Sequence, residues 1–126
     1  MGEAATHIFV YGTLMPGQPR WRLLQPYAAS WEPATARGRL WDTGRGYPAV
    51  RFDPGGGPVP GSRVEVVPEL ASAAISAMDR VEGEGVLFRR VEVATSSGPA
   101  LAYEWLGSTE DMAPLPHGWP APSPSG

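Results

Sequence analysis

Six segments of the chain carry the hydrophobic pattern of β-strands. Residues 7–11 ("HIFVY") combine aromatic and β-branched residues and end at a glycine, which is typical of a buried strand. Residues 62–67 ("SRVEVV") alternate polar and apolar side chains, as a half-buried strand does. The other predicted strands are residues 35–41, 47–52, 86–95 and 100–106. The "SSGP" between the last two predicts a hairpin.

The period of the pattern becomes helical after Pro68. Apolar residues recur at helical spacing at Leu70, Ala74, Ala77 or Met78, and Val81. This predicts a helix that ends in "EGEG", where Gly83 or Gly85 can adopt the left-handed conformation of a helix C-cap. A shorter helix is predicted in "RWRLLQPYAA", residues 20–29, which Pro26 ends or kinks.

Proline and glycine mark the irregular segments. We predict that "DPGGGPVPG", residues 53–61, is an exposed loop at one end of the fold. From Pro114 onward the chain is rich in proline, and we predict an irregular tail. We therefore expect a single domain over residues 1–113, followed by a Pro-rich irregular tail over residues 114–126.

The order of these elements predicts the fold class. Six short strands joined mostly by turns, with the longer helix inserted late in the chain, favour an antiparallel sheet. A chain of this size can protect the edges of such a sheet by closing it. We predict an α+β fold, with a small barrel or strongly curled sheet and helices outside it.

Composition excludes several classes of chemistry. A chain of 126 residues suits one domain with one core. It has no Cys, so disulfides, thiolate nucleophiles and sulfur-ligated metals are excluded. All ten cationic side chains are Arg, so no lysine amine can form a Schiff base. No carboxylate cluster lies at metal-ligand spacing around His7 or His117, and we expect neither a metal nor another cofactor.

Charge and hydropathy bear on the partners. The net charge is −3 and the arginines are scattered, so we expect no nucleic-acid partner. No apolar run reaches the ~18 residues of a membrane span, and we expect a cytoplasmic protein without membrane contact. No surplus apolar stripe indicates an oligomer, so we expect a monomer.

Two features are candidates for a site, and each has an ordinary explanation. The turn after the first predicted strand, Tyr11–Leu14 ("YGTL"), could present free backbone N–H groups to an anion, or Gly12 could simply let the chain turn. Glu82 lies at the C-terminal end of the predicted helix, where a carboxylate is disfavoured. Nearby Asp79 and Glu84 would raise its pKa further, as would burial. Glu82 could therefore act as a general base, or it could be an ordinary solvated carboxylate at the end of a helix.

Four motifs together resemble a known family. They are "VYGTL" (residues 10–14), "GYPAV" (46–50), "VPGSRVEV" (59–66) and "MDRVEGEGVLFRRVEV" (78–93). In order and spacing they resemble the gamma-glutamylcyclotransferase-like superfamily, in particular its AIG2-like branch of gamma-glutamylamine cyclotransferases. The resemblance covers residues 7–106. It implies a small mixed, mainly antiparallel β-barrel with flanking helices.

The resemblance also implies roles for individual residues. The backbone of Tyr11, Gly12, Thr13 and Leu14 would cradle the α-carboxylate end of a γ-glutamyl group. Glu82, in the "D-x-x-E-G" stretch, would be the catalytic acid and base. Phe88 stands where the family usually has Tyr, so a hydroxyl that would bear on the leaving group is absent here. Tyr103 would help line the pocket.

The implied reaction is the cyclisation of a γ-glutamyl amide to 5-oxoproline, with release of an amine or amino acid and without a cofactor. Its partner is a small γ-glutamyl molecule. One carboxylate with a raised pKa can serve both proton transfers. Arg89 and Arg90 point to opposite faces of their strand, so at most one could reach the substrate. Two alternatives stay open: a non-catalytic ligand-binding module on the same fold, and an unrelated interaction domain.

Overall fold

The computed structural model describes residues 3–120 of the chain. Its elements, in chain order, are the 3-10 turn η1 (Glu3–Thr6), β1 (His7–Val10), α1 (Trp21–Leu24), η2 (Gln25–Tyr27), β2 (Ala28–Asp42), β3 (Pro48–Phe52), β4 (Gly57–Val66), η3 (Pro68–Leu70), α2 (Ala71–Glu82), β5 (Phe88–Thr95), β6 (Gly98–Trp105) and β7 (Ala113–Pro114).

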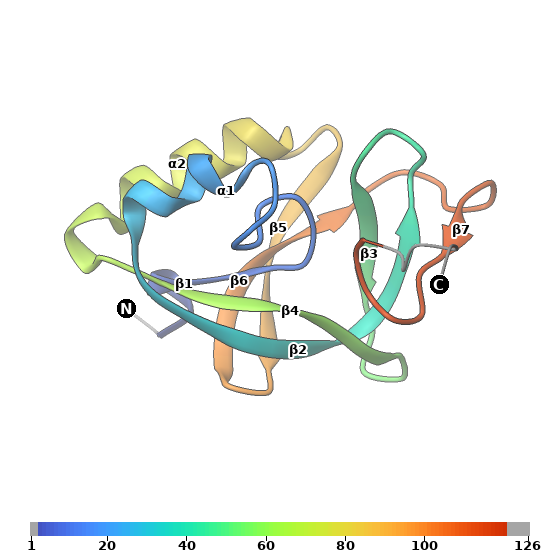
Figure 1. Cartoon of the computed structure of the whole chain (residues 1–126), viewed down its shortest axis with the longest axis horizontal. Helices are drawn as coiled ribbons and strands as arrows, with labels where there is room; N and C mark the ends of the chain where they lie inside the picture. Colours follow the sequence, from blue (N-terminus) through green and yellow to red (C-terminus); the bar gives the residue numbers. More distant parts are fainter. Residues whose placement is uncertain (1–2, 121–126) are drawn as a thin grey trace.

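Five strands close into a small barrel. Their order is β2-β4-β1-β6-β5, and a bridge between Ala36 and Thr95 joins β5 back to β2. The β1–β6 pair is parallel and the other pairs are antiparallel, which makes the barrel mixed. Strand β3 extends the sheet beyond β2 (Figure 1). The predicted fold, a mainly antiparallel barrel with flanking helices, is confirmed.

The short strand β1 is buried on both faces, so it lies at the centre of the molecule. Ile8 and Val10 belong to a core cluster that also contains Leu24 of α1 and Met78 of α2. Phe9, on the alternate face, packs in a second cluster formed by the barrel strands. Because the chain leaves β1 at Val10, the turn that follows begins inside the fold rather than at its surface.

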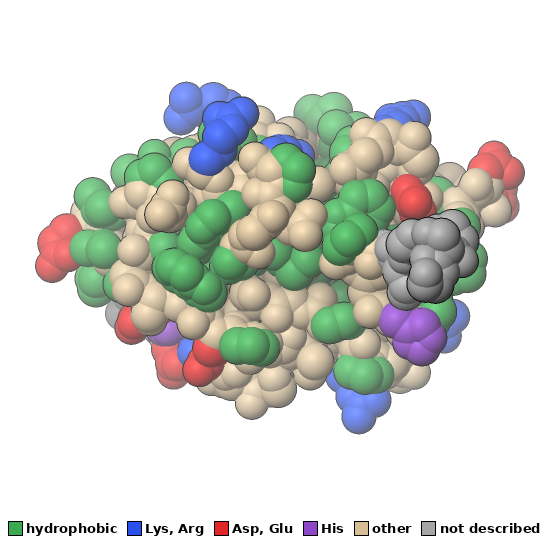
Figure 2. Space-filling view, in the orientation of Figure 1, with side chains coloured by type: hydrophobic (Ala, Val, Ile, Leu, Met, Phe, Trp, Pro, Cys, Tyr) green, Lys and Arg blue, Asp and Glu red, His purple; other side chains and the backbone are tan. Residues whose placement is uncertain are grey.

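Helix α2 covers one side of the barrel, with α1 beside it (Figure 1). It buries Ala71, Ala74 and Met78, which recur at intervals of three and four residues, as the sequence pattern indicates. Figure 2 shows the same view with side chains: basic residues are scattered along the edge of this face and form no continuous surface.

Two strands are longer than predicted. The segment 53–61, predicted to be an exposed loop, is a loop only as far as Gly56, because β4 begins at Gly57. Pro58 and Pro60 are tolerated there since β1 pairs only with residues 62–65 of β4, which leaves one side of residues 57–61 without that neighbour. Strand β2 likewise begins at Ala28 and runs through Pro33.

The segment from Pro114 contacts the barrel before it leaves the described part of the chain. Pro114 pairs with Trp41 of β2, and the Leu115 N–H donates to the Leu40 carbonyl at 2.8 Å. The Leu115 side chain is buried. Residues 116–120 form no helix or strand, and the end of the predicted irregular tail, residues 121–126, lies outside the described residues.

Candidate active site

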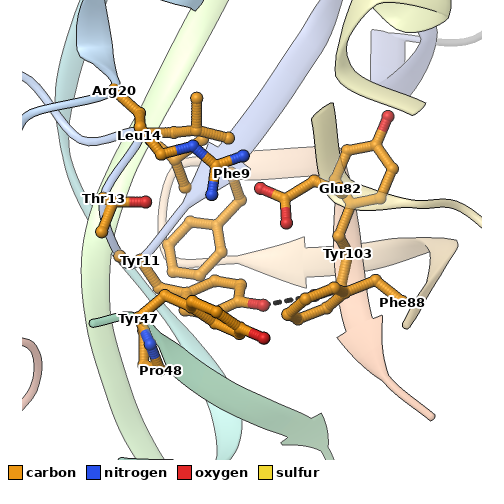
Figure 3. A pocket seen from close by; sticks show the side chains of 12 residues that line it. Phe9, Tyr11, Thr13, Leu14, Arg20, Tyr47, Pro48, Glu82, Phe88 and Tyr103 are labelled. Atoms are coloured by element: carbon orange, nitrogen blue, oxygen red, sulfur yellow. Dashed lines mark hydrogen bonds between the residues drawn. The ribbon is translucent and has the colours of Figure 1, made fainter. Parts of the chain in front are cut away.

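One pocket lies where the turn after β1, the end of α2 and the first residues of β3 and β5 meet (Figure 3). Its cavity volume is about 30 Å³, and it opens to solvent. All seven residues that the sequence singled out line it, although the two halves of the set are about seventy positions apart in the chain. The lining residues are Phe9, Val10, Tyr11, Gly12, Thr13, Leu14, Arg20, Tyr47, Pro48, Glu82, Phe88 and Tyr103.

The turn after β1 leaves backbone donors unused. The Gly12 carbonyl accepts from the Met15 N–H at 3.1 Å, and the Thr13 carbonyl accepts from the Arg20 N–H at 2.9 Å. Within residues 3–120, the N–H groups of Gly12, Thr13 and Leu14 donate to no protein acceptor. Consecutive free N–H groups at a pocket wall can bind a carboxylate or a developing oxyanion.

Gly12 is required by a close approach of β3. A Cβ at this position would lie 2.7 Å from both Cδ and Cγ of Pro48, well inside van der Waals contact. The absence of a side chain therefore lets the turn pack directly against Pro48, the first residue of β3; Pro48 and the preceding Tyr47 both line the pocket. The glycine serves packing as well as the turn.

Glu82 is the last residue of α2 and reaches the pocket from the helix face that packs on the core. It follows Met78 by four residues and Ala74 by eight, so it continues the buried face of the helix. Gly83, with φ of 65°, ends the helix directly after it. The Glu82 side chain is half-buried, and Figure 3 shows its carboxylate pointing into the pocket.

Burial raises the pKa of Glu82 above its usual value, and the nearby Arg20 guanidinium partly opposes this. The expectation that Asp79 and Glu84 raise the pKa was wrong. Asp79 is occupied elsewhere, because it accepts hydrogen bonds from Arg90 and, at 2.6 Å, from the Tyr103 hydroxyl. Glu84 is exposed and accepts a long 3.4 Å bond from the Arg90 N–H.

Two of the three tyrosines that line the pocket, Tyr11 and Tyr103, have their hydroxyl groups engaged in hydrogen bonds. The Tyr11 hydroxyl donates to the Tyr103 carbonyl at 2.5 Å, and burial together with the charges of Glu82 and Glu104 raises the pKa of Tyr11. Burial and the hydrogen bond to Asp79 raise the pKa of Tyr103. Both phenols therefore stay neutral, and they support the pocket wall rather than exchange protons.

The wall opposite the turn is aromatic. Phe88 is buried at the start of β5, and its ring centre lies 5.3 Å from that of Trp105 and 6.2 Å from that of Tyr47. This wall presents no hydroxyl at position 88. It offers an apolar surface to whatever group lies beside the Glu82 carboxylate.

Besides the core residues Phe9 and Val10 of β1, the lining residues that the sequence reasoning missed are Arg20, Tyr47 and Pro48. The last two lie within the "GYPAV" motif, which could have indicated them. Arg20 follows a proline-rich loop without periodicity, so no local signal pointed to it. The arginines that were considered instead do not line the pocket, because Arg89 pairs with Glu104 and Arg90 pairs with Asp79.

Two structural observations concern other functions. Among residues 3–120, no group of three or more His, Asp or Glu side chains is placed to hold a metal ion. No helix in the same part of the chain is long and apolar enough to cross a membrane.

Solved structures from several organisms share this fold. The chain is 24% identical to an uncharacterised protein from Pyrococcus horikoshii, with 82% of this chain and 80% of that chain covered and a TM-score of 0.57. A protein specific to uropathogenic E. coli is 21% identical, with 87% of each chain covered and a TM-score of 0.66. An AIG2-like protein from Mus musculus is 20% identical, with 82% of this chain and 78% of that chain covered and a TM-score of 0.62.

The family is shown by the sequence itself. No curated protein matches the chain at a significant level. A family model described as gamma-glutamyl cyclotransferase, AIG2-like, matches residues 8–121, which include every residue that lines the pocket. The chain therefore belongs to the AIG2-like gamma-glutamyl cyclotransferase family.

Proposed function

We propose that this protein is a γ-glutamyl cyclotransferase, which converts a γ-glutamyl amide into 5-oxoproline and a free amine or amino acid. The observation that carries the proposal is the position of the half-buried Glu82 carboxylate in the same pocket as the free N–H groups of Gly12, Thr13 and Leu14. A base and a set of anion-binding donors are the two elements that this cyclisation requires. The membership of the family agrees with it.

The reaction is an intramolecular exchange of one amide for another. The α-amino nitrogen of the substrate attacks its own γ-carbonyl carbon, which forms the ring C–N bond. The tetrahedral centre then collapses and breaks the bond to the departing nitrogen. The α-ammonium loses two protons in total: Glu82 passes one to the departing nitrogen, and the other goes to solvent. The released amine takes up a solvent proton in turn.

The pocket can contribute to both steps. Burial raises the pKa of Glu82, which brings it closer to the range in which one carboxylate can accept and return a proton. The turn would hold the carboxylate end of the substrate while Glu82 holds the amine, which bends the glutamyl chain toward its own carbonyl. Positioning of this kind can supply up to ~7–11 kcal/mol. The substrate's own amine cleaves the amide, so the mechanism needs no enzyme nucleophile.

The test is Glu82→Gln assayed for 5-oxoproline release from a panel of γ-glutamyl amines and dipeptides. We expect kcat/KM to fall by about 10²–10⁴, the usual contribution of a general acid–base. Glu84→Gln is the matched control, since this exposed glutamate lies two residues away and does not line the pocket. Circular dichroism would verify that both variants fold.

Three outcomes are distinguishable. Loss of activity in Glu82→Gln alone supports the mechanism, and full activity in that variant would overturn it. If the unmodified protein releases no 5-oxoproline from any member of the panel but still binds 5-oxoproline, it is a ligand-binding module on the cyclotransferase fold.

A further inference from the structure

Arg20 is the cation of the pocket. Among residues 3–120 it is the one Arg or Lys that lines the cavity, and its side chain is half-buried. Figure 3 shows its guanidinium reaching across the pocket toward the Glu82 carboxylate. No ion pair within 4.0 Å joins Arg20 to any carboxylate in the described part of the chain.

Arg20 is fixed to both halves of the site. Its backbone N–H donates to the Thr13 carbonyl at 2.9 Å, so it is attached to the turn that carries the free N–H groups. Its Nη2 donates to the Val81 carbonyl at 3.1 Å, directly before Glu82. A guanidinium has five N–H donors, and this contact uses one of them. The remaining donors are available to a ligand.

The chemistry of the substrate explains a cation in this place. In a γ-glutamyl group the amine and the carboxylate are attached to the same α-carbon. If Glu82 holds the substrate's amine, the substrate's α-carboxylate must lie next to that amine. The group that binds this α-carboxylate must therefore be close to Glu82 without forming an ion pair with Glu82. The backbone turn offers dipoles to that carboxylate, whereas Arg20 offers a full charge in a fork that matches it.

We propose that Arg20 binds the substrate's α-carboxylate together with the turn, and that it makes the pocket selective for γ-glutamyl groups whose α-carboxylate is free. This inference rests on the proposed function. The other arginines considered for this role are occupied by Glu104 and Asp79, as described above. Arg20 also lowers the pKa of Glu82 against the effect of burial, which favours the ionised carboxylate that the amine requires.

The experiment compares two substrates that differ in one group: a γ-glutamyl amine with a free α-carboxylate, and the same compound with that carboxylate converted to a carboxamide. We expect the unmodified protein to prefer the free acid in kcat/KM by about 10- to 150-fold, the value of a hydrogen bond to a charged group. In Arg20→Gln the preference should nearly disappear. In Arg20→Lys, which keeps the charge but loses the fork, part of it should remain.

Arg22→Gln is the matched control. Arg22 is exposed on α1, two residues away, and its side chain makes no hydrogen bond or ion pair within the described residues. It should leave the preference unchanged. Arg20→Gln should also move the acidic limb of the pH profile of kcat/KM to higher pH, because Glu82 loses the charge that lowers its pKa. If Arg20 had a purely structural role, Arg20→Gln would change neither the preference for the free acid nor the position of the acidic limb.

A binding measurement separates this proposal from the proposed function. NMR titration would compare 5-oxoproline with its carboxamide, without any need for turnover. If 5-oxoproline binds better and Arg20→Gln, but not Arg22→Gln, removes the difference, the inference about Arg20 is supported even when no substrate is cyclised. If Arg20→Gln keeps the preference in catalysis or in binding, or if both ligands bind equally, the inference is overturned.

Discussion

Gly12→Ala tests how closely the turn after β1 must pack against β3. The added methyl group would lie 2.7 Å from Cδ and Cγ of Pro48, whereas carbon atoms make favourable contact at about 3.5–4.0 Å. Pro48 is the first residue of β3 and is buried, so it cannot turn away as a flexible side chain could. The turn and the strand must therefore separate by about 1 Å.

This displacement sets the expected magnitudes. Overpacking of this kind costs about 1–3 kcal/mol of the free energy of unfolding. For a chain of this size, that corresponds to a fall in Tm of roughly 4–12 °C. A misplacement of about 1 Å between substrate and catalytic group can lower the rate by about 10²-fold. The turn carries the free N–H groups, so we expect 5-oxoproline release to fall by that order while the protein stays folded.

The assay measures Tm by circular dichroism and kcat/KM by 5-oxoproline release for Gly12→Ala and for a control, Gly57→Ala. At Gly57, on β4, a Cβ would meet no atom within 4 Å, so this substitution should change neither quantity. Unchanged Tm and activity in Gly12→Ala would show that the turn and β3 do not pack as described. A lower Tm with full activity would show that the turn does not position the substrate.

Two further predictions concern stability. The pKa of Glu82 is raised in the folded state, so as pH rises from about 4 the unfolded state loses this proton first, and the free energy of unfolding should decrease. Urea unfolding from about pH 4 to 8 should show this decrease in the unmodified protein and not in Glu82→Gln. Met78 is fully buried between α2 and the barrel, so Met78→Ala should lower the free energy of unfolding by about 2–5 kcal/mol in the same urea assay. The control is Val86→Ala, at a residue that is 80% exposed, which should lower the free energy of unfolding by less than about 0.5 kcal/mol.

The spacing of apolar residues predicted the parts of the fold that depend on contacts between residues close in the sequence. Helix α2 buries one regular face, and the β5–β6 hairpin alternates around a tight turn, so both are visible in the sequence. The early parts of β2 and β4 were not visible, because Pro33, Pro58 and Pro60 normally interrupt strands. Their extended conformation depends on pairing with each other, and that partnership is a property of the closed barrel rather than of either segment.

The site shows the same division. The turn and Glu82 each carry a local signal, since one is a glycine turn after a strand and the other a carboxylate at a helix end. Arg20 carries none: it enters the pocket because its N–H bonds to Thr13 and its side chain bonds to Val81, contacts that exist only after folding. Of the two causes expected for the raised pKa of Glu82, burial acts and the neighbouring carboxylates do not, because the sequence shows which charges are near in the chain but not where their side chains point.

The place of Glu82 at the end of α2 restricts how this helix can vary. Successive residues of an α-helix are rotated by about 100°, so one residue inserted or deleted between Met78 and Glu82 would swing the carboxylate out of the cavity. Gly83 ends the helix directly after Glu82, so no further helical turn follows that could bring another side chain into the orientation of Glu82. The exposed positions of α2 are thus free to accept substitutions, while the number of residues in its last turn is fixed.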